Sequence, residues 1–366
     1  MKFCVIGAGN GGRAFAAYLS SKGHKVNLYN RSLSRIIDIK KRGGIKAFGE
    51  IKGFFRCNLI TQNIKLALKD VDVILIVVPA SVHKEIASKI AKFLSQDQII
   101  MLNPGRTFGA VEFRREIEKC GVLFPVFIAE TQTLLFTSRQ LKKNQVEILK
   151  IKDVVDFAAF PEKDSFFIYD TLKDIFPHLN MVEDYLQMTL NNIGMLLHPT
   201  LSLLNAGIMD SRKEFKFYAE GATPRTCEVL EMVQNELNTI FGKLGLLQLR
   251  FCKWAKQTYG INENCIYTTI QNIKSYKNIS APKQLITRYF TEDVPTGLVP
   301  ISSLAAFLGI KTPIINSIIT LSSILCGRDF RIEGRTITNL NLVDYIKKRI
   351  KTEDLIDLDI KQEVLI

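Results

Sequence analysis

The sequence predicts an α/β domain with a doubly wound, mostly parallel sheet, followed by an all-α domain. At 366 residues the chain is long enough for about two domains. Short apolar runs alternate with helical patterns over the first third, which is typical of βαβ units, and from residue 182 onward the pattern is mainly helical. We expect the boundary near Asp184, with domains of residues 1–184 and 185–366.

The chain opens with a strand, a turn, a helix and a second strand. Residues 2–6 form an apolar run typical of a buried parallel strand, and residues 13–22 place small and apolar residues at helical spacing. Gly23 should end this helix, and residues 25–29 are the second strand. These elements span about 30 residues, the length that a right-handed βαβ crossover needs.

The alternation continues along the first domain. We expect further strands at 71–78, 98–102 and 122–129, with helices at 82–94 and 110–119 between them. Residues 145–160 have the pattern of paired strands at an added sheet edge.

The second domain is predicted from helical periodicity. Residues 185–204 form one long helix candidate, in which Pro199 should cause a kink because proline lacks the backbone N–H. Further helices are expected at 227–244, 298–308, 313–326 and 341–349.

The first turn matches the glycine pattern GxGxxG. Gly7 permits a tight turn, Gly9 lets a pyrophosphate approach the backbone, and Gly12 lets the helix pack closely on the strand. Asn10 and Gly11 complete the loop, whose N–H groups and helix dipole would face the anion. A merely tight turn is the alternative, but the position between a strand and a helix favours a dinucleotide-binding Rossmann domain.

The end of the second strand bears on the choice of cofactor. A site that prefers NAD usually carries an acidic residue here to accept from the ribose 2′-hydroxyl, and this chain has none. Arg31 and Ser32 stand there instead, and a guanidinium can bind a 2′-phosphate in a forked geometry. We therefore expect NADPH to be preferred and NADH to be tolerated, although Arg31 could also be an ordinary surface arginine.

Three further strands end in residues that should line the nicotinamide side. In open α/β sheets the ligand lies beyond the carboxyl ends of the strands. We expect cofactor contacts from the loops after the first two of these strands, at Val78, Pro79, Asn103 and Gly105. We expect substrate contacts from the loop after the third strand, at Thr131 and Gln132.

His198 is the strongest acid–base candidate among the four histidines. It lies in the most apolar segment of the chain, where a histidine needs a hydrogen-bond partner. Asn191 lies seven positions earlier and should share its helical face. A satisfied core histidine would fit the same pattern.

A polar segment interrupts the apolar region near residue 290. Arg288 could hold a substrate carboxylate in a bidentate fashion, and Asp293 could orient His198 and stabilise its imidazolium. A surface ion pair is the alternative for these two charges.

Bulk composition excludes several classes of protein. The net charge of +13 is spread along the chain without interleaved aromatic residues, so it suits anionic small molecules better than nucleic acid. Seven scattered cysteines without CxxC spacing argue against a zinc site and for reduced thiols in the cytoplasm. No signal peptide or membrane span is expected, and the protein should be a monomer or a homodimer.

With these residues the chain resembles the opine dehydrogenases, the octopine and nopaline dehydrogenase family. The more specific marks lie in the C-terminal half, at residues 191–199, 217–221, 291–300, 302–304 and 333–336. The resemblance implies that an amino acid condenses with an α-keto acid, often pyruvate, and that NAD(P)H reduces the imine to a secondary-amine dicarboxylate. It also implies that His198 is the catalytic histidine, Asp293 its partner and Arg288 the substrate-binding arginine.

Two other classes remain open at this point. Ketopantoate reductases and glycerol-3-phosphate dehydrogenases share the glycine loop and a helical second domain, but they typically use a lysine where this chain has His198. A protein that binds NAD(P)H without turnover would also keep the glycine loop. The sequence around residues 227–278 departs most from the family pattern, so it leaves the amino acid and the keto acid unnamed.

Overall fold

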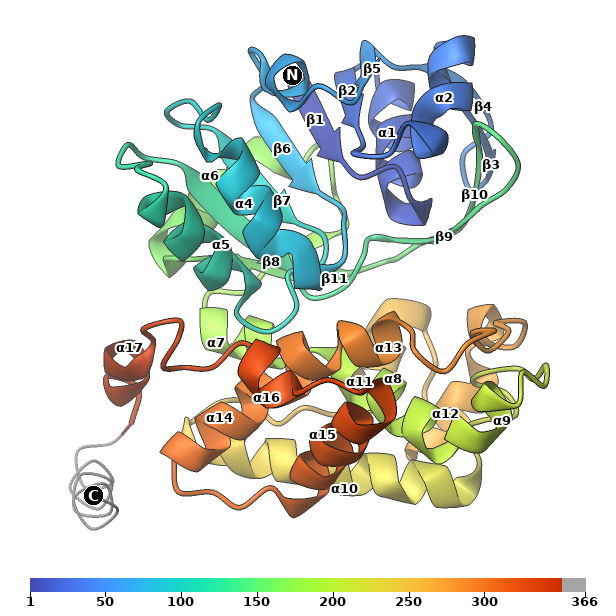
Figure 1. Ribbon diagram of the computed structural model, residues 1–366, viewed down its shortest axis with the longest axis vertical. Coiled ribbons are helices and arrows are strands. Elements are labelled where there is room, and N and C mark those ends of the chain that lie inside the picture. The colour runs from blue at the N-terminus through green and yellow to red at the C-terminus, as the bar shows by residue number, and fades with distance from the viewer. Residues whose placement is uncertain (351–366) are drawn as a thin grey trace. The chain divides into compact units, whose positions relative to one another are not determined.

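The computed structural model describes residues 1–350, which fold into two compact units (Figure 1). The first runs from Met1 to Thr189, and the second begins at Leu190. The division falls at the end of helix α7 (Tyr185–Leu190), whereas we predicted a boundary just before that helix.

The first unit is built on an eight-stranded sheet in the order β12-β11-β8-β7-β6-β1-β2-β5. Every neighbouring pair is parallel except β8 and β11, so the predicted doubly wound, mostly parallel sheet is confirmed. The strands are β1 (Lys2–Ile6), β2 (Lys25–Tyr29), β5 (Leu59–Thr61), β6 (Val73–Ile76), β7 (Ile99–Leu102), β8 (Phe127–Thr131), β11 (Val155–Ala159) and β12 (Leu179–Met181). The order reverses beside β1, and such switch points are where ligands bind in open α/β sheets.

Helices connect these strands and cover the sheet. They are α1 (Asn10–Ser21), α2 (Leu33–Arg42), α3 (Ile64–Leu68), α4 (His83–Ala91), α5 (Gly109–Lys119) and α6 (Ser165–Leu172), with short 3₁₀ turns at Ala80–Val82 and Glu162–Asp164. The expected helices at 82–94 and 110–119 are confirmed as α4 and α5. The strand expected at 122–129 begins later, at Phe127.

A second, four-stranded sheet packs on the other side of α1, in the order β4-β3-β10-β9. Its strands are β3 (Gly44–Gly49), β4 (Gly53–Arg56), β9 (Phe136–Gln140) and β10 (Gln145–Ile151). Our prediction that residues 145–160 form paired strands of one edge is wrong. β10 pairs with β3 and β9, while β11 joins the main sheet beside β8, because the turn between them lets β10 bury its alternate side chains in the core around α1.

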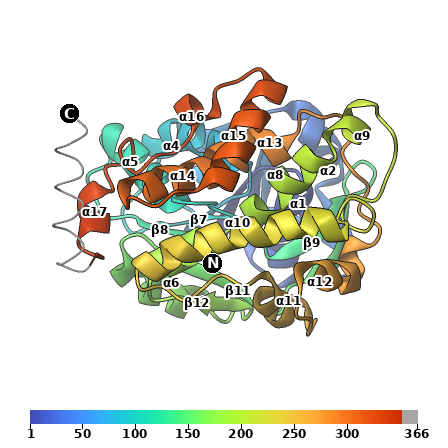
Figure 2. The same cartoon turned by 90° about the horizontal axis from the view of Figure 1, so that it is seen from below.

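The second unit is helical, as predicted. Its helices are α8 (Ile193–Leu204), α9 (Ala206–Asp210), α10 (Pro224–Lys243), α11 (Phe251–Tyr259), α12 (Ile266–Asn272), α13 (Arg288–Thr291), α14 (Val299–Phe307), α15 (Pro313–Cys326), α16 (Phe330–Glu333) and α17 (Val343–Lys347), with a 3₁₀ turn η3 (Lys274–Tyr276) and a π-helical turn η4 (Val294–Leu298). The long helix α10 runs along one side (Figure 2). The apolar helix α8 packs against α10, α13, α15 and η4.

The single long helix expected at 185–204 is in fact two helices. α7 ends at Leu190, and α8 begins at Ile193 with Asn192 as its N-cap. The side chain of Asn192 accepts a hydrogen bond from the N–H of Met195 at 3.3 Å. Asparagine stabilises a helix start in this way, and that local preference overrides the continuous apolar periodicity. Pro199 lies inside α8.

Within residues 1–350, the structure contains no helix with the length and apolar character that crossing a membrane requires.

Candidate active site

The glycine loop joins β1 to α1 as the sequence predicts. Gly7 has φ +113°, and a Cβ there would lie 2.3 Å from the carbonyl oxygen of Val77. A Cβ on Gly12 would lie 1.8 Å from the carbonyl oxygen of Gly7. By contrast, a Cβ on Gly9 would meet nothing within 4 Å. The loop therefore needs glycine for backbone packing at Gly7 and Gly12, and it leaves open space at Gly9, where the N-terminus of α1 begins.

Asn30 ties the end of β2 to the glycine loop. Its side-chain oxygen accepts a hydrogen bond from the N–H of Ala8 at 3.1 Å, and its amide donates to the carbonyl of Ser32 at 3.0 Å. Asn30 thus braces the loop from the position where an acidic residue would otherwise contact a ribose.

Arg31 and Ser32, which follow the end of β2, both have polar side-chain groups that could bind a ligand. The Arg31 guanidinium donates to Glu85 at 3.1 Å, and the two side chains are 71% and 52% exposed. So exposed a pair contributes at most about 1 kcal/mol, and a phosphate can compete for the guanidinium. Ser32 is the N-cap of α2, but its hydroxyl makes no capping hydrogen bond.

The loops after β6, β7 and β8 come together at the carboxyl ends of these strands. Gly105 donates its N–H to the carbonyl of Thr131 at 3.3 Å, and Thr131 donates its hydroxyl to the carbonyl of Leu102 at 3.3 Å. Asn103 donates its side-chain amide to Met101 at 2.9 Å. Val78 and Pro79 follow β6, and Gln132 follows β8. The structure thus places the predicted strand-end residues at one edge of the sheet.

Glu130 is a buried carboxylate at this edge that the sequence analysis missed. One of its oxygens accepts from the N–H of Ala110 at 2.6 Å, and the other accepts from the hydroxyl of Thr189 at 2.5 Å. Gly105 must be glycine beside it, because a Cβ there would lie 2.1 Å from Glu130 Oε2. Glu130 therefore positions the loop after β7 and the start of α5.

Lys152 is a second buried charge that the sequence did not reveal. It lies between β10 and β11 and donates to the hydroxyl of Thr133 at 2.8 Å. Burial, and then the positive charge of Arg106, lowers the pKa of Lys152 from 10.5 to about 7. A lysine between two strands has no sequence signal of its own, since its burial depends on how both sheets close around it.

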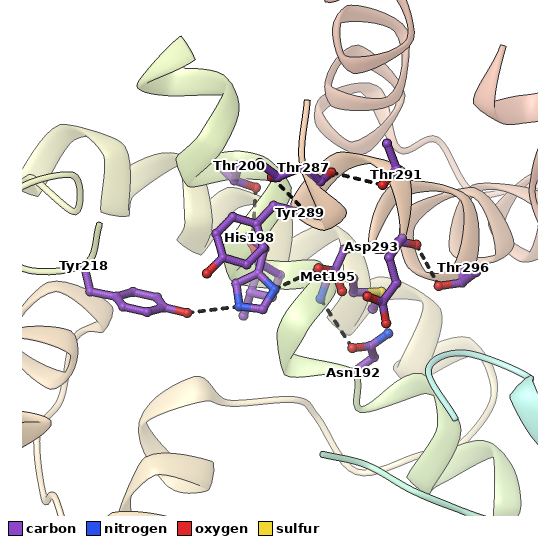
Figure 3. A network of polar contacts seen from close by, with 12 residues as sticks. Asn192, Met195, His198, Thr200, Tyr218, Thr287, Tyr289, Thr291, Asp293 and Thr296 are labelled. Atoms are coloured by element: carbon purple, nitrogen blue, oxygen red, sulfur yellow. Dashed lines mark hydrogen bonds and ion pairs between the residues drawn. The ribbon is translucent and has the colours of Figure 1, made fainter. Parts of the chain in front are cut away.

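In the second unit, His198 lies at the centre of a polar cluster (Figure 3). Its Nδ1 is 2.8 Å from Asp293 Oδ2, and its Nε2 is 3.0 Å from the hydroxyl of Tyr218. The Asp293 side chain is 0% exposed and that of His198 is 15% exposed. An ionised carboxylate only accepts hydrogen bonds, so Asp293 holds the imidazole proton on Nδ1. The predicted pairing of His198 with Asp293 is therefore present in the structure.

Asp293 reaches His198 because η4 approaches α8 closely. A Cβ on Gly297 would lie 2.5 Å from the Cβ of Met195, so only glycine allows this distance. The π-helical turn follows Asp293 directly, and single π turns are frequent at functional sites.

Aromatic rings enclose the imidazole. Tyr289 stacks on His198 with ring centroids 4.3 Å apart and 22° between the planes. Burial, and then the nearby Tyr289, Tyr259 and Asp293, raises the pKa of Tyr218 well above its usual 10, while Arg288 opposes this rise. Tyr218 therefore stays protonated. The sequence analysis used residues 217–221 only as a mark of resemblance and gave Tyr218 no role.

Arg288 and Asn191 lie near the ends of the elements that carry this cluster. Arg288 is exposed at the first position of α13, next to Tyr289. Asn191 precedes α8, so the expectation that it shares a helical face with His198 is wrong. Its side-chain oxygen is buried and accepts no hydrogen bond from the described residues. In the same part of the chain, residues 1–350, no group of three or more His, Cys, Asp or Glu side chains could hold a metal ion.

A Rossmann domain followed by a helical domain with a buried His–Asp pair is the arrangement expected of a two-domain, nicotinamide-dependent dehydrogenase. The chain matches the model of the NAD/NADP octopine/nopaline dehydrogenase alpha-helical domain over residues 181–326. The model of the NAD-dependent glycerol-3-phosphate dehydrogenase N-terminus matches residues 2–105.

Relatives extend this match to nearly the whole chain. Opine dehydrogenase of Arthrobacter sp. (strain 1C) is 41% identical over 341 residues, covering 93% of this chain and 95% of that protein. Octopine dehydrogenase in complex with NADH and agmatine has a TM-score of 0.74 at 20% identity, covering 89% and 90% of the two chains. Yersinopine dehydrogenase with bound NADP⁺ has a TM-score of 0.72 at 11% identity, covering 95% and 98%. The chain belongs to the octopine/nopaline dehydrogenase family and is an NAD(P)-dependent oxidoreductase that acts on CH–NH donors.

The low pKa of Lys152 predicts how stability depends on pH. The unfolded chain, with the ordinary lysine pKa of 10.5, binds more protons than the folded protein between about pH 7 and that value. Lys152 therefore makes the free energy of unfolding rise with pH across this window. Urea unfolding of the wild type and of Lys152→Met should show a flatter pH dependence for the variant between pH 7 and 10. Parallel profiles would mean that Lys152 is protonated equally in both states.

Proposed function

We propose that this enzyme condenses the amine of an amino acid with an α-keto acid, with pyruvate as the expected keto acid, and reduces the product to a secondary-amine dicarboxylate. The hydrogen-bonded pair of His198 and Asp293 carries this proposal, because both condensation and loss of water need proton transfer at one position. The relative from Arthrobacter is an opine dehydrogenase. Solved structures of octopine dehydrogenase contain NADH with L-arginine or with pyruvate, which supports the same pair of substrate classes here.

The first unit provides a cradle that fits a dinucleotide. Open space at Gly9 lets a pyrophosphate approach the loop at Gly7, Asn10, Gly11 and Gly12, where the N–H groups of α1 point outward. Val78, Pro79, Asn103 and Gly105, which follow β6 and β7, would hold the nicotinamide end of the cofactor at the carboxyl ends of these strands. When bound, NAD(P)H supplies the hydride that reduces the imine carbon.

We infer that NADPH is preferred over NADH. The side chain of Asn30 is hydrogen-bonded to Ala8 and Ser32. It therefore does not take the role of the acidic residue that binds the ribose 2′-hydroxyl in sites that prefer NAD. Arg31 could exchange its exposed contact with Glu85 for a 2′-phosphate, and the Ser32 hydroxyl is available to donate a further hydrogen bond.

His198 acts as the acid and base of the condensation. It accepts a proton from the amine of the amino acid, whose lone pair then attacks the keto carbon. A proton moves from the added nitrogen to the keto oxygen to give the carbinolamine. His198 then returns its proton to the carbinolamine hydroxyl, which leaves as water while the nitrogen lone pair forms the protonated imine. Asp293, fully buried, keeps the imidazole in one tautomer and stabilises its protonated form.

Arg288 is the proposed anchor for a substrate carboxylate. A guanidinium binds a carboxylate with two parallel hydrogen bonds, and such an anchor sets the orientation of the reacting carbon. Asn191, Thr131 and Gln132 are proposed as further substrate contacts. The side-chain oxygen of Asn191 is buried and accepts no hydrogen bond within residues 1–350, which supports a role as an acceptor. The seven free cysteines support a cytoplasmic location, where we propose that the protein works as a monomer or a homodimer.

The direct test follows the oxidation of NADPH and of NADH by their absorbance, with pyruvate or 2-oxoglutarate against a panel of L-amino acids. We expect oxidation only when an amine and a keto acid are both present. Oxidation with a keto acid alone would instead indicate a simple keto-acid reductase. Tight binding of NADPH without turnover on any pair would favour a protein that binds the cofactor without catalysis.

Replacement of His198 should separate catalysis from cofactor binding. His198→Ala removes the acid–base and should lower kcat by about 100-fold or more. The dissociation constant for NADPH, measured by nucleotide fluorescence, should not change, because the glycine loop lies in the other unit. A kcat close to that of the wild type would refute the assignment.

Replacement of Arg31 should separate the two cofactors. Arg31→Ala removes the proposed phosphate ligand, so KM for NADPH should rise roughly tenfold while KM for NADH stays near its original value. Glu85→Gln is the matched control, since it releases Arg31 from its ion pair and should not raise KM for NADPH. Equal changes in both KM values for Arg31→Ala would disprove the preference.

A further inference from the structure

The hydroxyl of Tyr218 faces the ring nitrogen of His198 that Asp293 leaves free. Nε2 is 3.0 Å from this hydroxyl, while Nδ1 is bonded to Asp293 (Figure 3). Proton transfer between His198 and a substrate must use Nε2, because the proton on Nδ1 is held by the carboxylate. In this structure, the first oxygen that such a proton meets belongs to Tyr218.

Tyr218 is held rigidly in this position. Its ring stacks on Tyr276 with centroids 4.1 Å apart and 16° between the planes, and Phe217 packs against it edge-on at 5.0 Å. The backbone on either side is also fixed, since Phe217 donates to Ile279 at 2.8 Å and Ala222 donates to Tyr218 at 3.2 Å. The ring contacts with Tyr276 and Phe217 hold the phenol beside Nε2.

A phenol can partner both protonation states of the imidazole. Its O–H donates to Nε2 when His198 is neutral, and its oxygen accepts from Nε2–H when His198 is protonated. Orientation of the ring does not require this contact, because Asp293 fixes the tautomer and Tyr289 stacks on the ring face. A hydroxyl at this point therefore has a use beyond holding the ring in place.

We propose that Tyr218 is a catalytic residue that relays protons between His198 and the reacting substrate. This inference rests on the proposed function. In the dehydration step, the Nε2–H bond of the imidazolium breaks and its proton joins the phenol oxygen. The original O–H bond of the phenol breaks and its proton joins the carbinolamine hydroxyl. The C–O bond then breaks, the nitrogen lone pair forms the C=N bond, and water leaves, so that Tyr218 ends neutral and His198 ends unprotonated.

The surroundings of Tyr218 agree with this direction of transfer. Arg288 is close enough to oppose the rise in the pKa of Tyr218. Arg288 begins the short helix whose next residue, Tyr289, stacks on His198, so a carboxylate held at Arg288 would be anchored on the element that borders the imidazole. Burial raises the pKa of Tyr218, which favours the protonated phenol.

The test replaces only the hydroxyl. Tyr218→Phe keeps the stack on Tyr276 and should lower kcat by about 100-fold, with KM for the reduced cofactor unchanged. Tyr276→Phe is the matched control, since it also removes a buried phenol hydroxyl from the same stack, and its kcat should stay near that of the wild type. Thermal melting of both variants shows whether either change disturbs folding.

A second measurement needs no variant. A relay moves two protons in one step. A plot of wild-type kcat against the fraction of deuterium oxide in the solvent should therefore be curved. A straight line would overturn the relay, as would a Tyr218→Phe variant with near-normal kcat while His198→Ala is inactive. If the wild type never oxidises NAD(P)H with any amine and keto acid, the proposed function itself fails, which is a different result from an active enzyme that does not need Tyr218.

Discussion

The chemistry of the second unit depends on one buried carboxylate. Asp293 is fully removed from water, and a charge in that position is costly unless it is paired and hydrogen-bonded. Its partner is His198, on a different element, so the pairing requires η4 to lie directly against α8. Gly297 makes that approach possible, because a side chain there would collide with Met195. Asn192 caps the start of α8, the helix that carries His198 to the carboxylate. Packing, capping and the acid–base pair are therefore one constraint.

The first unit follows the same logic with another buried carboxylate. Glu130 bonds the start of α5 and the hydroxyl of Thr189, and it needs Gly105 beside it. These contacts hold the loops at the carboxyl ends of β7 and β8. The glycine loop adds backbone contacts so close that no side chain fits at Gly7 or Gly12. In each unit, a glycine thus allows the close backbone approach that places the buried carboxylate, and a side chain at that glycine would prevent it.

The two halves of the chain carry different kinds of information about the enzyme. Residues 2–105 match a domain that other dehydrogenases share, because a strand, a glycine turn and a helix solve the general problem of binding a pyrophosphate. Residues 181–326 match the family's own helical domain, in which the His–Asp pair and its aromatic surroundings lie. The diffuse positive charge of +13 suits the anionic cofactor and substrates of such an enzyme.

The sequence by itself determined the fold class and the glycine loop, because local periodicity and residue chemistry carry that information, while the pairing of His198 with Asp293 was implied by the resemblance to the opine dehydrogenases. It did not reveal that the helix over 185–204 breaks at Asn192, where a capping side chain overrides apolar periodicity, or that β10 and β11 belong to different sheets. Tyr218, Glu130 and Lys152 emerged only from the tertiary structure. Their protonation and contacts depend on burial by segments distant in sequence, and no spacing along the chain encodes burial of that kind.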